Sequence, residues 1–117
     1  MYKGLLIKES LKDEIVINHL NVVKCELWDT PNKPRYWTAL SFESEENDLP
    51  LILSKCLLSK DECGVVWFVD FKDDAYKYIV MANNIYKYQL GNIDEKNIVC
   101  KKLEENGVPL QQINWSE

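Results

Sequence analysis

Short apolar runs separated by turn-forming residues mark out the strands of a predicted sheet. The second half of the chain holds three β-rich runs, and the polar segments between them have the length of hairpin loops. Alternating apolar and polar positions indicate further strands in the first half. The predicted strands cover residues 2–7, 22–28, 36–42, 65–71, 75–82 and 85–90.

A first helix is predicted over about residues 11–20. Ser10 and Asp13 form a capping pattern there, and the apolar residues that follow are spaced along one helical face. Three consecutive β-branched residues at 15–17 oppose a helix slightly, so a strand stays open as the alternative for this segment.

Two further helices are predicted from the residues at their ends. Pro50 suits the first turn of a helix over about residues 50–58, because its missing N–H has no intrahelical partner there, and Asp48 can cap that helix. Asp94 can cap a last helix over about residues 95–106, which is followed directly by a glycine.

The resulting order of elements is β-α-β-β-α-β-β-β-α, with hairpin-length connections between most consecutive strands. We therefore predict an α+β fold in which a mainly antiparallel sheet of about five to six strands packs against two to three helices. The 117 residues contain no repeat, no linker and no abrupt change of composition. Residues 1–117 are thus predicted to form one domain.

The predicted hairpin loops at 73–74 and 83–84 divide the side chains of the last three strands between two faces. One face is apolar and is expected to be core. The other is unusually aromatic and carries Trp67, Tyr76 and Tyr78. Either helices cover this second face too, or it is partly exposed and forms a binding surface, which a twofold dimer could also use.

Charge argues against nucleic acid as a partner. The net charge is −5, and Arg35 is the only arginine, whereas nucleic-acid binding relies on basic side chains. Residues 36–54 contain four acids and no Lys or Arg: Glu43, Glu45, Glu46 and Asp48. Such a run is either a solvated loop or a docking patch for a basic partner.

The candidate catalytic and metal-binding residues form no recognisable motif. The four cysteines lack the close spacing of a zinc site, so reduced thiols are the better explanation for them. His19 is the only histidine, and no nucleophile motif accompanies it. We expect no metal and no cofactor, and a role other than catalysis is favoured. No apolar run reaches the length of a membrane span and no signal peptide is recognised, so a cytoplasmic protein is expected.

These features favour a small acidic protein-binding module that docks a basic protein, with an inhibitor or immunity-type role against a basic enzyme as one version. Its expected contacts are the acidic residues within 43–48 and the aromatic residues Trp67, Tyr76 and Tyr78. The alternative is a small-molecule-binding or hydrolytic domain with a pocket between the sheet and the helices.

Overall fold

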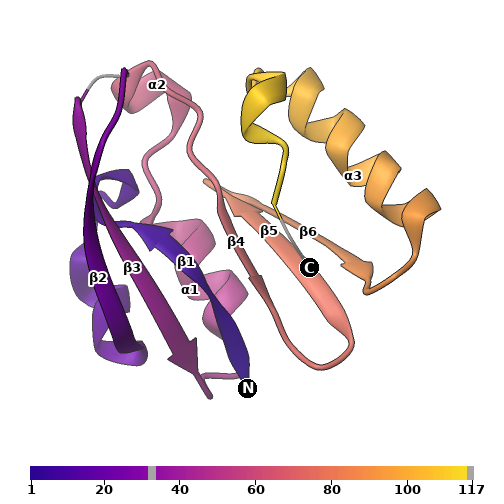
Figure 1. Cartoon of the computed structure of the whole chain (residues 1–117), viewed down its shortest axis with the longest axis horizontal. Coiled ribbons are helices and arrows are strands. Elements are labelled where there is room, and N and C mark those ends of the chain that lie inside the picture. The colour runs from indigo at the N-terminus through magenta and orange to yellow at the C-terminus, as the bar shows by residue number, and fades with distance from the viewer. Residues whose placement is uncertain (32–33, 116–117) are drawn as a thin grey trace.

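Within residues 1–31 and 34–115, which the computed structural model describes, all six predicted strands pair into one antiparallel sheet with the spatial order β2-β3-β1-β4-β5-β6 (Figure 1). The strands are β1 (Tyr2–Ile7), β2 (Asn21–Asp29), β3 (Tyr36–Ser44), β4 (Val69–Lys72), β5 (Tyr76–Met81) and β6 (Asn84–Gln89). The predicted α+β fold with an antiparallel sheet is thereby confirmed.

Helical segments connect and follow these strands. In the described part of the chain they are α1 (Leu49–Cys56), α2 (Lys60–Cys63) and α3 (Ile93–Glu105), with 3-10 helices η1 (Lys8–Ser10), η2 (Glu14–His19) and η3 (Leu110–Gln112). Pro50 lies in the first turn of α1, as predicted, and Asp48 occupies the N-cap position, but its side chain makes no capping hydrogen bond. The side chain of Asn92, rather than that of Asp94, caps α3, and Gly107 beyond its end has a φ of 92°.

The segment predicted as a helix over residues 11–20 differs in type and extent. Only Glu14–His19 are helical, and they form a 3-10 helix. Asp13 caps this helix by accepting a hydrogen bond from the Ile15 amide at 3.0 Å, while Leu11 makes an isolated β-bridge with Leu57. The β-branched residues after Glu14 lower the α-helical propensity, and a short 3-10 helix is all that forms before β2.

Two differences concern the segment before β4. Ser59 and Glu62 form a capping box that begins the short helix α2, which the sequence analysis missed. The strand predicted over residues 65–71 is also shorter, because β4 begins only at Val69. Residues 65–68 lie outside the sheet, so strand alternation does not decide where their side chains point.

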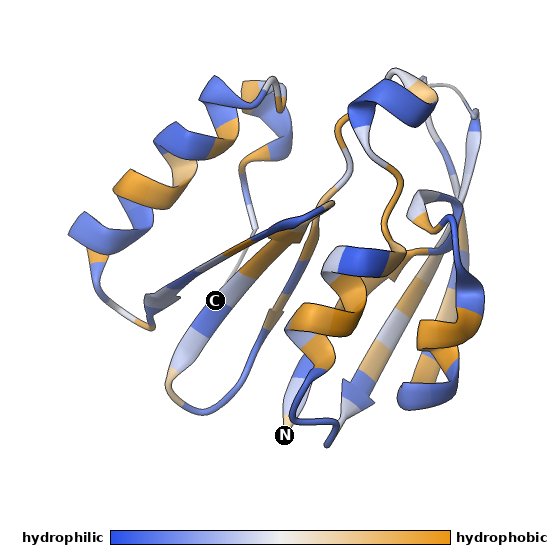
Figure 2. Cartoon of the chain, turned by 180° about the vertical axis from the view of Figure 1, so that it is seen from behind, coloured by the Kyte–Doolittle hydropathy of each residue, from blue (hydrophilic) through white to orange (hydrophobic). Residues whose placement is uncertain are grey.

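Helices cover both faces of the sheet, at different places (Figures 1 and 2). On one face α1 and η2 pack on a core that includes Leu6, Phe71 and Tyr78 from the central strands. On the opposite face α3 packs on Ile79 and Tyr88 of β5 and β6. Of the two alternatives for the aromatic face, the structure therefore has the covered one.

In the β4–β5 and β5–β6 hairpins, the strand pairing is shifted by two residues from the predicted pairing. Met81 pairs with Asn84, and Phe71 pairs with Tyr78. The turn between β5 and β6 is therefore 82–83, and Asn83 adopts a φ of 62°. Because side chains alternate with a period of two, a shift by two residues leaves each side chain within these strands on its predicted face.

Strand β1 lies between the two halves of the sheet, and its Gly4 allows a close contact there. Gly4 pairs with Phe42 of β3 on one side and with Phe71 of β4 on the other. A Cβ atom added to Gly4 would overlap the backbone oxygen of Asp70 and the Cβ atom of Phe71. Any side chain at position 4 would thus push β4 away from β1.

We expect Gly4→Ala to lower the free energy of unfolding by about 2–4 kcal/mol, because its methyl group must displace the β4 backbone. Urea titration followed by circular dichroism measures the change. Lys3→Ala, at the exposed neighbouring position in β1, serves as the control and should change the value by no more than about 0.5 kcal/mol. Equal unfolding midpoints for the two variants would contradict the close contact at Gly4.

Candidate functional site

Acidic residues from two chain segments meet at one end of the sheet. Strand β3 ends at Ser44 and leads into the acidic run, and the turn from β4 to β5 lies at the same end, beside the start of β1 (Figure 1). Glu45 and Asp73 line one small hollow of about 140 Å³ with Tyr2. We call this surface the acidic end, and its carboxylates belong to Glu43, Glu45, Glu46, Asp48, Asp73 and Asp74.

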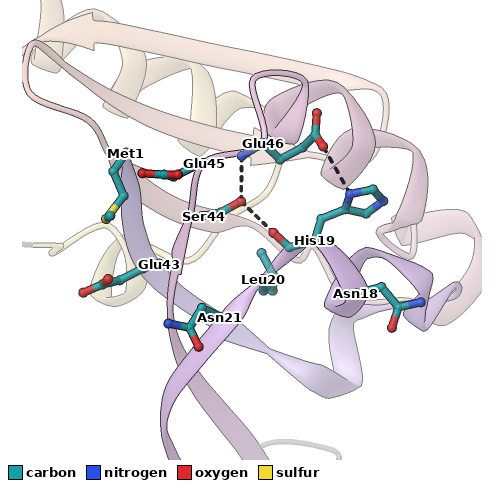
Figure 3. Close-up of a pocket in the computed structure, with 9 residues that line it drawn as sticks. All are labelled: Met1, Asn18, His19, Leu20, Asn21, Glu43, Ser44, Glu45 and Glu46. Atoms are coloured by element: carbon teal, nitrogen blue, oxygen red, sulfur yellow. Dashed lines mark hydrogen bonds and ion pairs between the residues drawn. The ribbon is translucent and has the colours of Figure 1, made fainter.

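A wider hollow of about 660 Å³ opens beside the acidic run (Figure 3). Glu46 turns toward His19, whose Nδ1 lies 3.3 Å from a carboxylate oxygen of Glu46, while Glu43 and Glu45 lie on the other side, near Met1. The amides of Asn18 and Asn21 and the carboxylates of Glu43, Glu45 and Glu46 are among its lining groups. Carboxylates and amide oxygens can accept hydrogen bonds from the ammonium group of a lysine or the guanidinium group of an arginine, so the hollow suits either side chain.

The side chain of Ser44 links the two chain segments that border this hollow. Its buried hydroxyl donates a hydrogen bond to the backbone oxygen of His19 at 2.7 Å and accepts one from the backbone amide of Glu46 at 3.2 Å (Figure 3). The hydroxyl is therefore bound to backbone groups and not to the imidazole ring. Ser44 and His19 accordingly do not form a nucleophile and base pair in this structure.

The carboxylates of the acidic run differ in how far they are already paired. Glu43 lies 4.0 Å from the Nζ atom of Lys3, and Glu46 faces His19, so each of the two carboxylates has an exposed partner. Glu45 and Asp48 are exposed, and neither forms an ion pair within the described residues. Because exposed ion pairs contribute little, all four carboxylates remain available to an incoming cation.

Asp73 has a structural role in the turn from β4 to β5. Its Oδ1 atom accepts hydrogen bonds from the amides of Ala75 at 2.9 Å and Tyr76 at 2.7 Å, and its Oδ2 atom accepts one from the Tyr78 hydroxyl at 3.2 Å. Burial raises the pKa of Asp73, but these hydrogen bonds, together with the positive charge of the N-terminus, lower it further than burial raises it. Asp73 therefore stays ionised and holds the turn, while its neighbour Asp74 is exposed.

The three aromatic residues predicted to form a binding face are not together on a surface. Tyr78 is buried under α1, stacks on Phe71 with ring centroids 5.2 Å apart, and has a raised pKa, chiefly through burial. Trp67 is also buried, but it packs with Ile7 and Ala39 on the opposite side of the sheet, because it lies outside β4. Tyr76 alone of the three is exposed, at the start of β5 next to the acidic end.

A trough that the sequence pattern does not predict lies on the part of the sheet that α3 leaves uncovered. It encloses about 170 Å³ above β1 and is lined by Leu5, Ile7, Trp28, Trp37, Val66, Trp67, Phe68, Asp70 and Gln112. The rings of Trp37 and Trp67 are in contact, with centroids 5.0 Å apart. Asp70 accepts a hydrogen bond from the buried Nζ atom of Lys77 at 2.9 Å, so its charge is balanced within the protein.

Metal clusters and membrane-spanning helices are not found among the described residues. Within them no three His, Cys, Asp or Glu side chains are placed to hold a metal ion, and no helix is long and apolar enough to cross a membrane. The proposed function below rests on the acidic end, and its alternative rests on the trough.

Known proteins do not indicate what these surfaces do. Comparisons of the chain with known protein families, with curated proteins and with solved structures find no match. The function must therefore be inferred from the residues at the two surfaces and from their geometry.

Removal of the Asp73 carboxylate should destabilise the protein in a pH-dependent way. Because the pKa of Asp73 is lower in the folded than in the unfolded chain, its stabilisation is present above pH about 4 and is lost as the pH falls through the folded-state value. Asp73→Ala should cost about 1–2 kcal/mol at pH 7 and less at pH 3. Asp74→Ala is the matched control, and urea titrations at the two pH values compare them. A cost for Asp73→Ala that equals the control at pH 7 would contradict this role.

Proposed function

We propose that this chain is a cytoplasmic protein-binding module whose acidic end docks a basic protein partner. The observation that carries the proposal is the gathering of six carboxylates at one end of the sheet, where the end of β3, the β3–α1 connection and the β4–β5 connection supply one, three and two of them. Inhibition of a basic enzyme is one concrete version of this role, since a rigid acidic surface can cover a basic active site.

Charge at this end serves association in two ways. Exposed carboxylates steer a basic partner during encounter and raise the association rate, which is the usual effect of charges at the rim of an interface. The polar hollow beside the run can then receive a lysine or arginine side chain between Glu43, Glu45 and Glu46. Tyr76 adds an exposed aromatic ring at the same end, and tyrosine is a common anchor in protein interfaces.

The state of the cysteines supports a reducing compartment. All four cysteines lie in the described part of the chain and are free thiols, and Cys25 and Cys63 are exposed. Exposed free thiols are typical of proteins in the cytoplasm, where the redox balance keeps them reduced. A cytoplasmic location therefore forms part of the proposal.

The test neutralises Glu45 and Asp48, the two carboxylates of the acidic run that form no ion pair within the described residues, and measures binding. Tagged wild-type protein captures partners from the cytosol of its host, and the affinity of each purified partner is then measured at low and at high salt. We expect Glu45→Gln combined with Asp48→Asn to weaken binding of the partner about tenfold at low salt, because each exposed charge contributes up to about 1 kcal/mol.

The matched control removes the same charge elsewhere. Glu104→Gln combined with Glu105→Gln neutralises two exposed acids near the end of α3, away from the acidic end (Figure 1). This control should bind the partner within about twofold of wild type. Equal weakening by both double variants, or binding that does not respond to salt, would contradict docking through the acidic end.

Binding of a small apolar molecule in the trough is the second candidate function. The indole Nε1 atom of Trp37 is buried there without a hydrogen-bond partner among the described residues, so a ligand oxygen could satisfy it after a small rearrangement. The volume of about 170 Å³ lies below the usual range of about 300–1,000 Å³ for ligand sites, which ranks this function second.

Tryptophan fluorescence can test this second function. A ligand seated in the trough should change the emission of the wild-type protein, and Trp28→Ala, which removes one partly exposed wall, should abolish the saturable part of that change. No saturable change with any member of a fragment collection would remove this candidate.

A further inference from the structure

Strand β2 is an edge strand with unusual exposure. It occupies one end of the sheet, pairs with β3 on its inner side only, and all nine of its residues, Asn21–Asp29, are exposed. Val23 is 57% exposed and Leu27 is 70% exposed. A long edge strand that presents apolar side chains together with free backbone groups is a template for pairing with another strand.

The sequence of β2 is complementary to itself in the antiparallel direction. If two copies pair around a twofold axis at Cys25, Lys24 of each copy lies opposite Glu26 of the other. In the same register Val23 lies opposite Leu27, so apolar residues meet apolar residues. An axis moved by one residue to Glu26 would instead place two Glu26 carboxylates opposite each other, which disfavours that register.

We propose that β2 is the interface of a homodimer, in which two copies pair antiparallel around Cys25 and join their sheets into one. The partner of the β2 edge is thus a second copy of this chain, because an antiparallel copy of β2 places opposite charges beside each other and apolar side chains beside each other. The proposal is independent of the acidic end, and it replaces the aromatic face, which α1 covers, as the surface for dimerisation.

The bulge in β2 sets the length of the expected contact. The register between β2 and β3 shifts between Val22 and Lys24, with Val23 as the extra residue. A bulge twists the edge locally, so pairing between copies is expected over residues 23–27 only, with the bulged Val23 at its margin. Because such an interface is smaller than that of a permanent dimer, association is expected at roughly micromolar to millimolar protein concentrations.

The edge strand at the other end of the sheet, β6, has features that disfavour pairing and can be compared with β2. At the end of β6 the backbone amide of Gln89 donates a hydrogen bond to the Glu95 side chain of α3 at 3.1 Å. Lys87 in the middle of β6 would face a second Lys87 in a pairing centred there. Lysines on an edge are one of the common means by which proteins discourage such pairing.

A charge exchange tests the register directly. Lys24→Glu places only carboxylates at the centre of the paired strands, Glu26→Lys places only ammonium groups there, and the two changes together restore opposite charges. Sedimentation equilibrium from about 10 μM to 1 mM should give a dimer for the wild type and an at least tenfold weaker dimer for each single variant. The double variant should return to within about threefold of the wild type.

Oxidative crosslinking tests the position of the axis. Residues directly opposite in an antiparallel pair have Cα atoms about 4.5–5.5 Å apart, a separation that a disulfide can span. With diamide as the oxidant, two Cys25 thiols form one S–S bond, and their two electrons and two protons pass to the N=N bond of diamide. Dimer should form quickly in the wild type and in Cys63→Ser, which removes the other exposed cysteine, and not in Cys25→Ser.

Crosslinking of the charge variants distinguishes the proposed dimer from random collision of thiols and from a dimer that forms through another surface. Crosslinking at Cys25 should slow at least tenfold in Lys24→Glu and recover in the double exchange variant, since both keep the thiol. A monomer at all concentrations would overturn the proposal and leave the edge to a strand from another protein. A dimer that all charge variants retain would overturn it too, because the interface would then lie elsewhere. Thermal melts confirm that each variant is folded.

Discussion

The pairing of β1 with both β3 and β4 is the contact on which the rest of the structure depends. The strand pairs β2–β3 and the meander β4–β5–β6 are each built from neighbours in sequence, and β1 is the strand that joins them into one sheet. The two units can approach closely only because Gly4 has no side chain to meet the backbone of Asp70 and Phe71. The same pairing brings the β3–α1 and β4–β5 connections together and so creates the acidic end.

The placement of the helices decides which surfaces are left for function. Helix α1 lies over the central strands on one face, and α3 lies over β5 and β6 on the other (Figures 1 and 2). On the face of α3, Leu58 and Val65, which flank α2, pack on Ile7 of β1 and Ala39 of β3, and the tryptophan trough opens beside them. The hollow at the acidic end meets β2 at Asn21, outside the residues 23–27 that are expected to pair, so docking of a partner and self-association need not compete.

The sequence contained the local signals of the fold but not its long-range contacts. Hairpin-length loops, Pro50 at the start of α1 and the glycine after α3 act through neighbouring residues, so these elements could be predicted. The place of Trp67 could not, because it depends on where pairing of β4 with β1 begins. The proximity of Asp73 to Glu45 likewise arises from strand pairing between distant segments. Of the six carboxylates at the acidic end, the sequence pattern singled out the four that lie within residues 43–48.

Hydrogen exchange measured by mass spectrometry at two protein concentrations tests most directly the claim that the two edges of the sheet differ. If β2 pairs with a second copy, the amides of residues 23–27 should exchange more slowly at about 500 μM than at about 5 μM, whereas those of 84–89 in β6 should exchange at the same rate. The same exchange of residues 23–27 at both concentrations, or equal slowing at both edges, would contradict the account.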